Sequence, residues 1–208
     1  MTAPNIDTSA RDRLSYVIGD RLYLNITDRC TLRCTFCPKH RAGPRVHDYH
    51  LGLSRLPDTE EIISAIERPG DWAEVVFCGF GEPTLRLAVL LAVARHVRQH
   101  GGRVRVNTDG LANRVHKRNV LPELATCVDA LSVSMNAHNA ALYEQHCRPA
   151  MRDSWPAMLD FLALAPTYIK SVNATAIDGL AGVDIEACER LARARGVGFR
   201  RRVLDVVG

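Results

Sequence analysis

The chain has no long hydrophobic run. Nowhere in its 208 residues do about 18 apolar residues follow one another, as a membrane-spanning helix would need. Its opening residues, MTAPNIDTSARDR, contain no apolar core, so we expect no secretory signal there and a cytoplasmic, reducing location. Internal repeats and low-complexity tracts are absent as well. In a reducing compartment the seven cysteines are not expected to form disulfides, and a tight cluster of them indicates metal or redox chemistry.

Composition predicts one ordinary globular domain. Apolar residues make up 47% of the chain and charged residues 24%, both typical of a globular protein. We expect a loose segment over residues 1–13 and a single core domain over 14–208. The net charge of +4 is too small to indicate nucleic-acid binding, and it would suit contact with an acidic electron carrier equally well.

Short β-like runs alternate with helical patterns along the chain. One helix begins with the capping-box arrangement of Asp58 and Glu61, and glycines at 101–102 and 196 stand where helices should end. Six β-then-α units predict a parallel sheet with right-handed crossovers. The expected strands are Leu22–Thr27, Ala73–Cys78, Arg103–Thr108, Ala130–Met135, Ile169–Ile177 and Val197–Leu204, and the later expected helices are Leu85–His100, Arg114–Thr126, Asn139–His146, Ser154–Ala165 and Asp184–Arg195.

Several of these strands alternate between polar and apolar residues, whereas a parallel strand covered on both faces is usually apolar throughout. A sheet curved into a partial barrel would let the polar face line a wet cavity, so the pattern predicts an α/β fold, a partial (βα)6 TIM-like barrel. The alternative is an ordinary sheet whose Ser and Asn side chains are hydrogen-bonded internally. The polar positions are Tyr23, Asn25, Thr27, Arg105, Asn107, Ser132, Ser134, Asn136, Ser171, Asn173 and Thr175.

The first predicted strand leads into a cysteine loop with the spacing C-x3-C-x2-C, formed by Cys30, Cys34 and Cys37. An iron–sulfur cubane normally takes four thiolates, so three would leave one iron with the open site that catalysis needs. The same thiols with His40 could instead form a closed Cys3His zinc site, and spacing alone does not separate the two. The other cysteines, at 78, 127, 147 and 188, are expected to be small core residues.

The loop resembles the C-x3-C-x-aromatic-C signature of the radical S-adenosylmethionine (SAM) superfamily, with Phe36 in the aromatic position. The segment Gly79-Phe80-Gly81-Glu82-Pro83 looks like the Gly-Gly-Glu-Pro motif of that superfamily, and Asn107-Thr108-Asp109-Gly110 is similar to its polar segment after the third strand. Within the superfamily, NITDRC, VNTDGLAN and SMNAHN…Y…CRP most resemble the TatD-associated group.

The resemblance implies an enzyme with a [4Fe–4S] cluster held by Cys30, Cys34 and Cys37. SAM would chelate the open iron and be cleaved reductively, giving methionine and a 5′-deoxyadenosyl radical that acts on an unidentified substrate. Glu82 would receive the SAM ammonium, and Gly79 and Gly81 would let the backbone approach its methionine part. The remaining expected cofactor contacts are Phe36 beside the adenine, and Asn107, Asp109, Ser134 and Asn136 at the carboxyl ends of neighbouring strands.

Two further features concern partners and substrate. The resemblance implies a small electron donor such as flavodoxin or ferredoxin, and a possible TatD-family partner. Arg200 and Arg202 share a face of the last strand and could neutralise an anionic group, although an Arg-rich stretch is more often a solvated edge. The segment Lys39–Leu56 could act as a lid, with its three histidines, His40, His47 and His50, in solvent.

Overall fold

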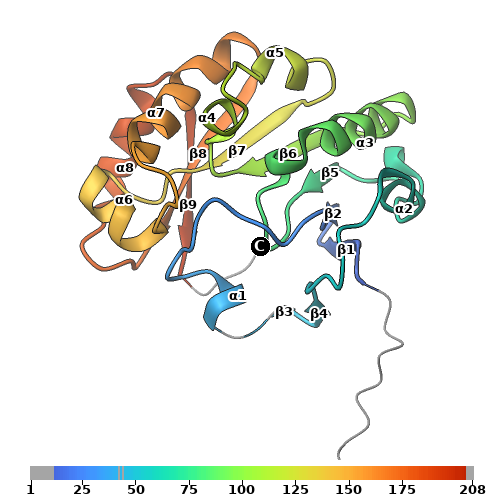
Figure 1. The fold of residues 1–208 in the computed structure, drawn as a ribbon. Helices are drawn as coiled ribbons and strands as arrows, with labels where there is room; N and C mark the ends of the chain where they lie inside the picture. Colours follow the sequence, from blue (N-terminus) through green and yellow to red (C-terminus); the bar gives the residue numbers. More distant parts are fainter. Residues whose placement is uncertain (1–11, 42, 44, 205–208) are drawn as a thin grey trace, which may run out of the picture.

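The computed structural model describes residues 12–41, 43 and 45–204, and its centre is a seven-stranded sheet (Figure 1). The strand order is β1-β2-β5-β6-β7-β8-β9; β1 pairs with β2 antiparallel, and the six strands from β2 to β9 run parallel. All six expected strands are present. They are β2 Arg21–Leu24, β5 Glu74–Phe77, β6 Val104–Thr108, β7 Ala130–Ser134, β8 Ser171–Asp178 and β9 Gly198–Val203, and β1 is Ser15–Ile18.

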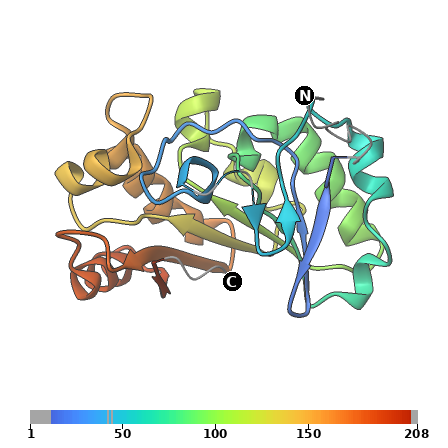
Figure 2. The same cartoon turned by 90° about the horizontal axis from the view of Figure 1, so that it is seen from below.

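Most helices cover one face of the sheet, while a short helix and a hairpin lie across the other (Figures 1 and 2). The hairpin pairs β3, Arg45–Val46, with β4, Tyr49–His50, and the short helix is α1, Pro38–Arg41. The covering elements are α2 Thr59–Ser64, α3 Leu87–Gln99, α4 Ala112–His116, α5 Leu121–Leu124, α6 Ala140–Cys147, α7 Ser154–Leu164 and α8 Ile185–Arg193; three 3-10 turns are Pro69–Asp71, Pro83–Arg86 and Ala165–Thr167.

The two faces of the sheet differ in chemistry, as the alternation predicted. On β6 and β7, Val104, Val106 and Leu131 are almost fully buried in the main core beneath the helices. The residues between them point the other way and line a cavity on the concave face: Arg105, Asn107, Ser132 and Ser134, joined by Thr175 from β8. A mostly parallel sheet with a polar inner face confirms the predicted partial TIM-like barrel.

Local signals place several helix ends correctly. The capping box at α2 is formed, because Glu61 N donates to Asp58 Oδ1 at 2.8 Å and Asp58 N donates to Glu61 Oε2 at 2.9 Å. Asn139 caps α6, and Asp184 caps α8, each through a side-chain oxygen that accepts from a backbone amide. Gly101 has φ +79, the left-handed conformation that favours glycine after a helix. These residues therefore mark helix ends where the sequence predicts them.

One predicted helix is wrong in extent. The expected continuous helix over Arg114–Thr126 is two short helices, α4 and α5, with Lys117 in a left-handed conformation between them. Pro122 stands within the first turn of α5, where its missing amide costs nothing, whereas in the middle of a longer helix it would break the hydrogen-bond ladder. Strand β1 and the β3–β4 hairpin were not expected.

A second, smaller apolar cluster lies on the concave side. Tyr16 of β1 stacks on Tyr23 of β2 with ring centroids 5.2 Å apart, and Phe80 packs into the same group. Val46 of the hairpin and Leu51 complete it, so the hairpin closes one side of the cavity. Of the expected loose segment, 1–13, residues 1–11 lie outside the described residues. Among the described residues, no helix is both long and apolar enough to cross a membrane.

Candidate functional site

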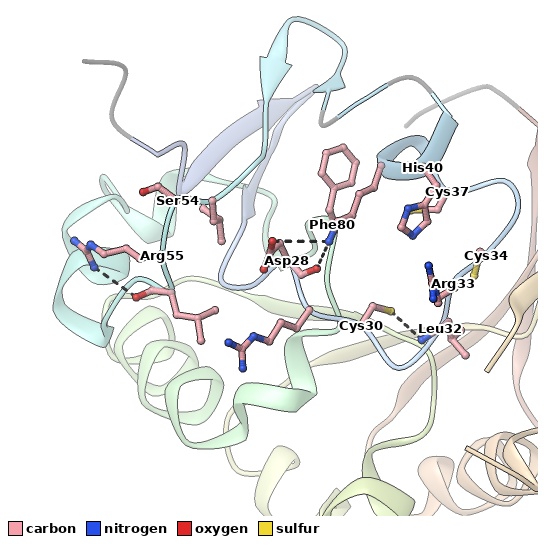
Figure 3. A pocket seen from close by; sticks show the side chains of 14 residues that line it. Asp28, Cys30, Leu32, Arg33, Cys34, Cys37, His40, Ser54, Arg55 and Phe80 are labelled. Carbon is pink, nitrogen blue, oxygen red and sulfur yellow. Dashed lines mark hydrogen bonds and ion pairs between the residues drawn. The ribbon is translucent and has the colours of Figure 1, made fainter. Parts of the chain in front are cut away.

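The cavity lies at the carboxyl ends of the parallel strands. A volume of about 280 Å³ is enclosed by the loops after β2, β5, β6 and β7 together with β9. A second cavity of about 540 Å³ adjoins it beside the cysteine loop (Figure 3). Cys30, Cys34 and Cys37 line both cavities, so the structure brings the three predicted thiols to one place.

The cysteine loop is fixed by backbone hydrogen bonds to the end of α6. Arg33 N donates to Cys147 O at 3.0 Å, and Thr35 N donates to His146 O at 2.8 Å. Ala150 N returns a hydrogen bond to Thr31 O at 2.9 Å. The loop is therefore held in a strand-like conformation against residues 146–150.

All three thiols have pKa values raised above the ordinary value for cysteine. For Cys30 the main cause is burial, followed by the negative charges of Glu82 and Asp109. For Cys34 it is the hydrogen bond with the buried Cys147 thiol, followed by burial, and for Cys37 it is burial. The thiols are therefore protonated at neutral pH, and each must lose its proton to bind a metal.

The thiols do not surround one point. In Figure 3 the Cys30 sulfur is directed at Leu32 N, 3.4 Å away. Within the described part of the chain, no group of three or more His, Cys, Asp or Glu side chains is arranged to hold a single metal ion. A tetrahedral zinc would draw its sulfurs together through bonds of about 2.3 Å, whereas a cubane takes one thiolate at each of three separate corners. His40, the fourth ligand of the zinc alternative, is exposed.

Glu82 is almost fully buried, with 3% of its surface exposed, and its carboxylate ties two strand ends together. Oε1 accepts from Thr84 N at 3.0 Å, Thr84 Oγ1 at 2.6 Å and Thr108 Oγ1 at 2.9 Å, and Oε2 accepts from Asp109 N at 2.7 Å. A carboxylate oxygen has two lone pairs, so Oε2 keeps one for a further donor. Glu82 lines the inner cavity, where such a donor could reach it.

Asp109 is a second buried carboxyl beside Glu82. It accepts from Thr31 Oγ1 and, at 2.9 Å, from Leu111 N, and so ties the cysteine loop to the end of β6. Burial raises the pKa of both carboxyls, and the charge of Asp109 further raises the pKa of Glu82. No Lys, Arg or His among the described residues forms an ion pair with either. Two buried carboxyls without a cation fit a positively charged ligand such as an ammonium group.

Close packing explains why glycine stands at positions 79 and 81. A Cβ on Gly81 would lie 2.4 Å from Thr27 O and 2.5 Å from Arg29 O, both backbone atoms of the segment that enters the cysteine loop. A Cβ on Gly79 would lie 2.3 Å from the side-chain oxygen of Asn25. Glycine at these positions lets the two loops touch; that their backbone also approaches SAM stays a prediction.

The remaining predicted cofactor contacts all line the inner cavity. Asn107 accepts from Arg105 at 2.8 Å, so its amide oxygen is engaged within the protein. Asn136 is 2% exposed, has φ +59, and carries a buried Oδ1 without a hydrogen-bond partner among the described residues. Such an orphaned acceptor is costly unless a ligand donor meets it. Phe36 and Ser134 are half-buried at the cavity wall.

Sequence reasoning missed several contributors. Cys78 was expected in the core, yet it lines the cavity, while Cys127, Cys147 and Cys188 are buried as expected. The threonines that hold the two carboxyls stand within or next to the recognised motifs but were given no role from the sequence; they are Thr31, Thr84 and Thr108. Arg200 and Arg202 do line the cavity. The histidines at 40, 47 and 50 are exposed, as predicted.

Comparison with known proteins shows the family to which the chain belongs. The sequence profile of the Radical SAM superfamily matches residues 24–194. The GTP 3′,8-cyclase of Erythrobacter litoralis (strain HTCC2594) is 28% identical over an alignment of 199 residues that covers 92% of this chain and 54% of the cyclase. The chain therefore spans about half the length of that relative.

Solved structures support the fold. A radical SAM methyltransferase from Sphaerobacter thermophilus superposes with a TM-score of 0.58 at 18% identity, covering 91% of this chain and 68% of that one. SuiB of Streptococcus suis bound to SAM gives a TM-score of 0.65 at 13% identity, covering 89% of this chain and 40% of SuiB. At these identities the likeness concerns the fold alone.

Proposed function

The chain belongs to the radical SAM superfamily, whose cofactors are a [4Fe–4S] cluster and SAM, and on that premise we propose that it is an enzyme that cleaves SAM reductively. Cys30, Cys34 and Cys37 are the residues that would hold the cluster. When bound, the cluster and SAM together supply a 5′-deoxyadenosyl radical able to remove a hydrogen atom from a substrate. The substrate itself is not identified.

One observation carries the proposal: a buried, uncompensated carboxyl pair shares a cavity with a three-thiol loop. Glu82 and Asp109 would receive the ammonium of SAM, because no cation among the described residues pairs with either carboxyl and a bound ammonium would favour their ionised forms. Once ionised, Glu82 Oε2 would accept a hydrogen bond from that ammonium. Asp109 also fixes Thr31 inside the loop, so SAM and the loop would be held by the same carboxyl.

The chain also offers groups for the rest of SAM. The orphaned Oδ1 of Asn136 can accept from a ribose hydroxyl, and its amide is held by Ser134 O at 3.4 Å. Phe36 belongs to the cysteine loop and lines the inner cavity, where its main chain would approach the adenine. The apolar cluster around Phe80 excludes water from one wall of the cavity, which favours controlled use of a reactive radical.

Radical SAM enzymes need a reductant, and flavodoxin or ferredoxin is the expected donor. The outer cavity presents Arg29 and Arg33 at the surface of the cysteine loop, a basic rim that suits an acidic carrier. A cytoplasmic location, the TatD-associated subgroup and a TatD-family partner stay predictions from the sequence.

The test is anaerobic reconstitution with iron and sulfide, followed by dithionite and SAM. We expect a brown protein with about four irons per chain and the release of 5′-deoxyadenosine. Cys34→Ala should lose the cluster, because two thiolates cannot replace three, whereas Cys188→Ala, which removes a buried thiol of α8, should keep it.

Each failure has a distinct meaning. A colourless protein with one zinc would refute the cluster. A fully loaded protein that forms no 5′-deoxyadenosine would be an electron-transfer protein and not a SAM-cleaving enzyme. Normal cluster content in Cys34→Ala would remove that residue from the ligand set.

A further inference from the structure

The last residue of α6 is a buried cysteine, Cys147, that lies against the cysteine loop. The two backbone amides that flank Cys34 donate to the last carbonyls of this helix, at 3.0 and 2.8 Å. These bonds bring the two cysteines together, and their thiols share a hydrogen bond. Cys147 is fully buried and is not among the residues that line the two cavities, whereas Cys34 is half-buried and lines both. Cys34 is therefore the thiol of this pair that a cluster can reach.

Metal binding decides the direction of the hydrogen bond between the two thiols. A cysteine gives up its proton when it becomes a ligand, so a ligating Cys34 can only accept a hydrogen bond. The donor must then be the thiol of Cys147. The Cys147 sulfur already accepts from Asn136 Nδ2 at 3.8 Å, which leaves its own proton for Cys34. Asn136, Cys147 and Cys34 thus form a chain in which each group donates to the next.

A second donor on the same face of α6 has no partner. Tyr143 stands one helical turn before Cys147, so the two side chains lie on one side of the helix. The Tyr143 ring packs against Trp155 with centroids 5.4 Å apart, and its buried hydroxyl has no hydrogen-bond partner among the described residues. Burial raises the pKa of Tyr143, and the charges of Cys147 and Asp109 raise it further. This face of α6 therefore offers donors where a cluster and its thiolates would add negative charge.

We propose that Cys147 is a positioning residue of the cluster and that its thiol donates a hydrogen bond to the Cys34 thiolate. The inference rests on the proposed function, because it needs the cluster that the cysteine loop would hold. Hydrogen bonds to the sulfur ligands of an iron–sulfur cluster change its reduction potential. A reduced cluster carries one more negative charge than an oxidised cluster, so a donor stabilises the reduced form more. The Cys147 thiol therefore raises the reduction potential and eases reduction by the electron donor.

The experiment is an anaerobic redox titration of the loaded full chain without SAM, followed by electron paramagnetic resonance of the reduced cluster. We expect Cys147→Ala to shift the balance roughly three- to tenfold toward the oxidised cluster, which lowers the potential by up to about 59 mV. Cys147→Ser, whose hydroxyl is also a donor, should stay near the wild type. Cys188→Ala removes an equally buried thiol, from α8, and should leave the potential unchanged.

Iron content and unfolding midpoints show whether each variant is folded and loaded. Cys147→Val has a side chain of similar volume without a donor, and it repeats the test if the alanine variant does not load. If neither apolar variant loads while Cys147→Ser does, the donor is needed to hold Cys34 on the cluster, and the role of Cys147 is confirmed.

Several results would overturn this role. They are a shift below twofold in the loaded apolar variants, an equal shift in Cys188→Ala, or a potential in Cys147→Ser as low as in Cys147→Ala. Loss of the cluster in all three Cys147 variants would show that Cys147 is itself a ligand, which also overturns the role. If the potential shifts as expected but no 5′-deoxyadenosine forms, the proposed function fails while the hydrogen bond stands. A wild type that takes up no cluster refutes both.

Discussion

Replacing Gly81 by alanine tests whether the glutamate turn and the cysteine loop depend on direct backbone contact. The new Cβ would lie 2.4 Å from Thr27 O and 2.5 Å from Arg29 O, and ordinary contact begins at 3.4 Å. The turn must therefore withdraw by about 1 Å, because backbone atoms cannot rotate aside as a side chain can. That movement also breaks the hydrogen bond of 2.7 Å from Glu82 N to Arg29 O.

The expected cost follows from these two effects. Overpacking costs about 1–3 kcal/mol, and loss of the hydrogen bond costs about 0.5–1.5 kcal/mol. We expect Gly81→Ala to lower the free energy of unfolding by about 2–4 kcal/mol, and hence the melting temperature by roughly 5–15 °C for a chain of this size. Cluster loading should fall too, since the displaced atoms belong to the entry of the cysteine loop.

Gly79→Ala is the matched comparison. Its Cβ would meet mainly the buried Asn25 side chain, whose Nδ2 donates to Arg13 O at 3.1 Å and to Leu51 O at 2.9 Å, so this clash falls outside the backbone of the cysteine loop. Both variants should lose stability in urea unfolding, whereas the iron content after reconstitution should fall more for Gly81→Ala. If Gly81→Ala unfolds within 0.5 kcal/mol of the wild type, a margin typical of harmless surface changes, the contact argument is refuted.

Three other predictions concern single side chains. Glu82→Ala should weaken SAM binding by about 1.5–3 kcal/mol, measured on loaded protein by equilibrium binding; unchanged affinity would remove Glu82 from the site. The pKa of Glu61 is lowered to about 2, first by the hydrogen bond from Arg55 and then by that from Asp58 N. The ionised Glu61 carboxylate therefore stabilises the fold at pH values above 4.5, its ordinary pKa. This stabilisation is lost as the pH falls toward 2. The difference in melting temperature between wild type and Glu61→Gln should accordingly shrink between pH 6 and pH 3, and a constant difference would contradict the assignment. Tyr143 Oη is buried without a partner among the described residues, so Tyr143→Phe should leave stability unchanged or raise it by about 1 kcal/mol in urea unfolding, and a clear loss would reveal a partner.

The barrel could be predicted because polar and apolar residues alternate along its strands, which shows that the two faces of the sheet have different environments. Alternation on β6 separated Val104 and Val106 from Arg105 and Asn107, and the structure places the two sets on opposite faces. The hairpin and β1 were missed because strands of two to four residues have too little periodicity to stand out. Their stability comes from tertiary contacts such as Tyr16 on Tyr23, which no local pattern reveals.

The site was predictable where chemistry-bearing residues form a short motif, and not where its supports are distant. The three cysteines and the glutamate turn were recognisable by spacing, and the structure brings them to one cavity. The hydrogen bond from Thr31 to Asp109, and the contact of Cys34 with Cys147, join residues far apart in the chain, so no local pattern predicts them.

The break between α4 and α5 could have been predicted from Pro122, because proline cannot continue a helix interior.

The attachment of the cysteine loop to the end of α6 has a consequence for biosynthesis. The loop is made early, but its hydrogen-bond partners, residues 146–150, leave the ribosome much later. Until then the loop has its contacts with Glu82 and Asp109 but lacks those with the end of α6. Iron delivery therefore meets its binding loop in final form only once residues 146–150 have been synthesised, and chains that terminate before this segment should retain less iron.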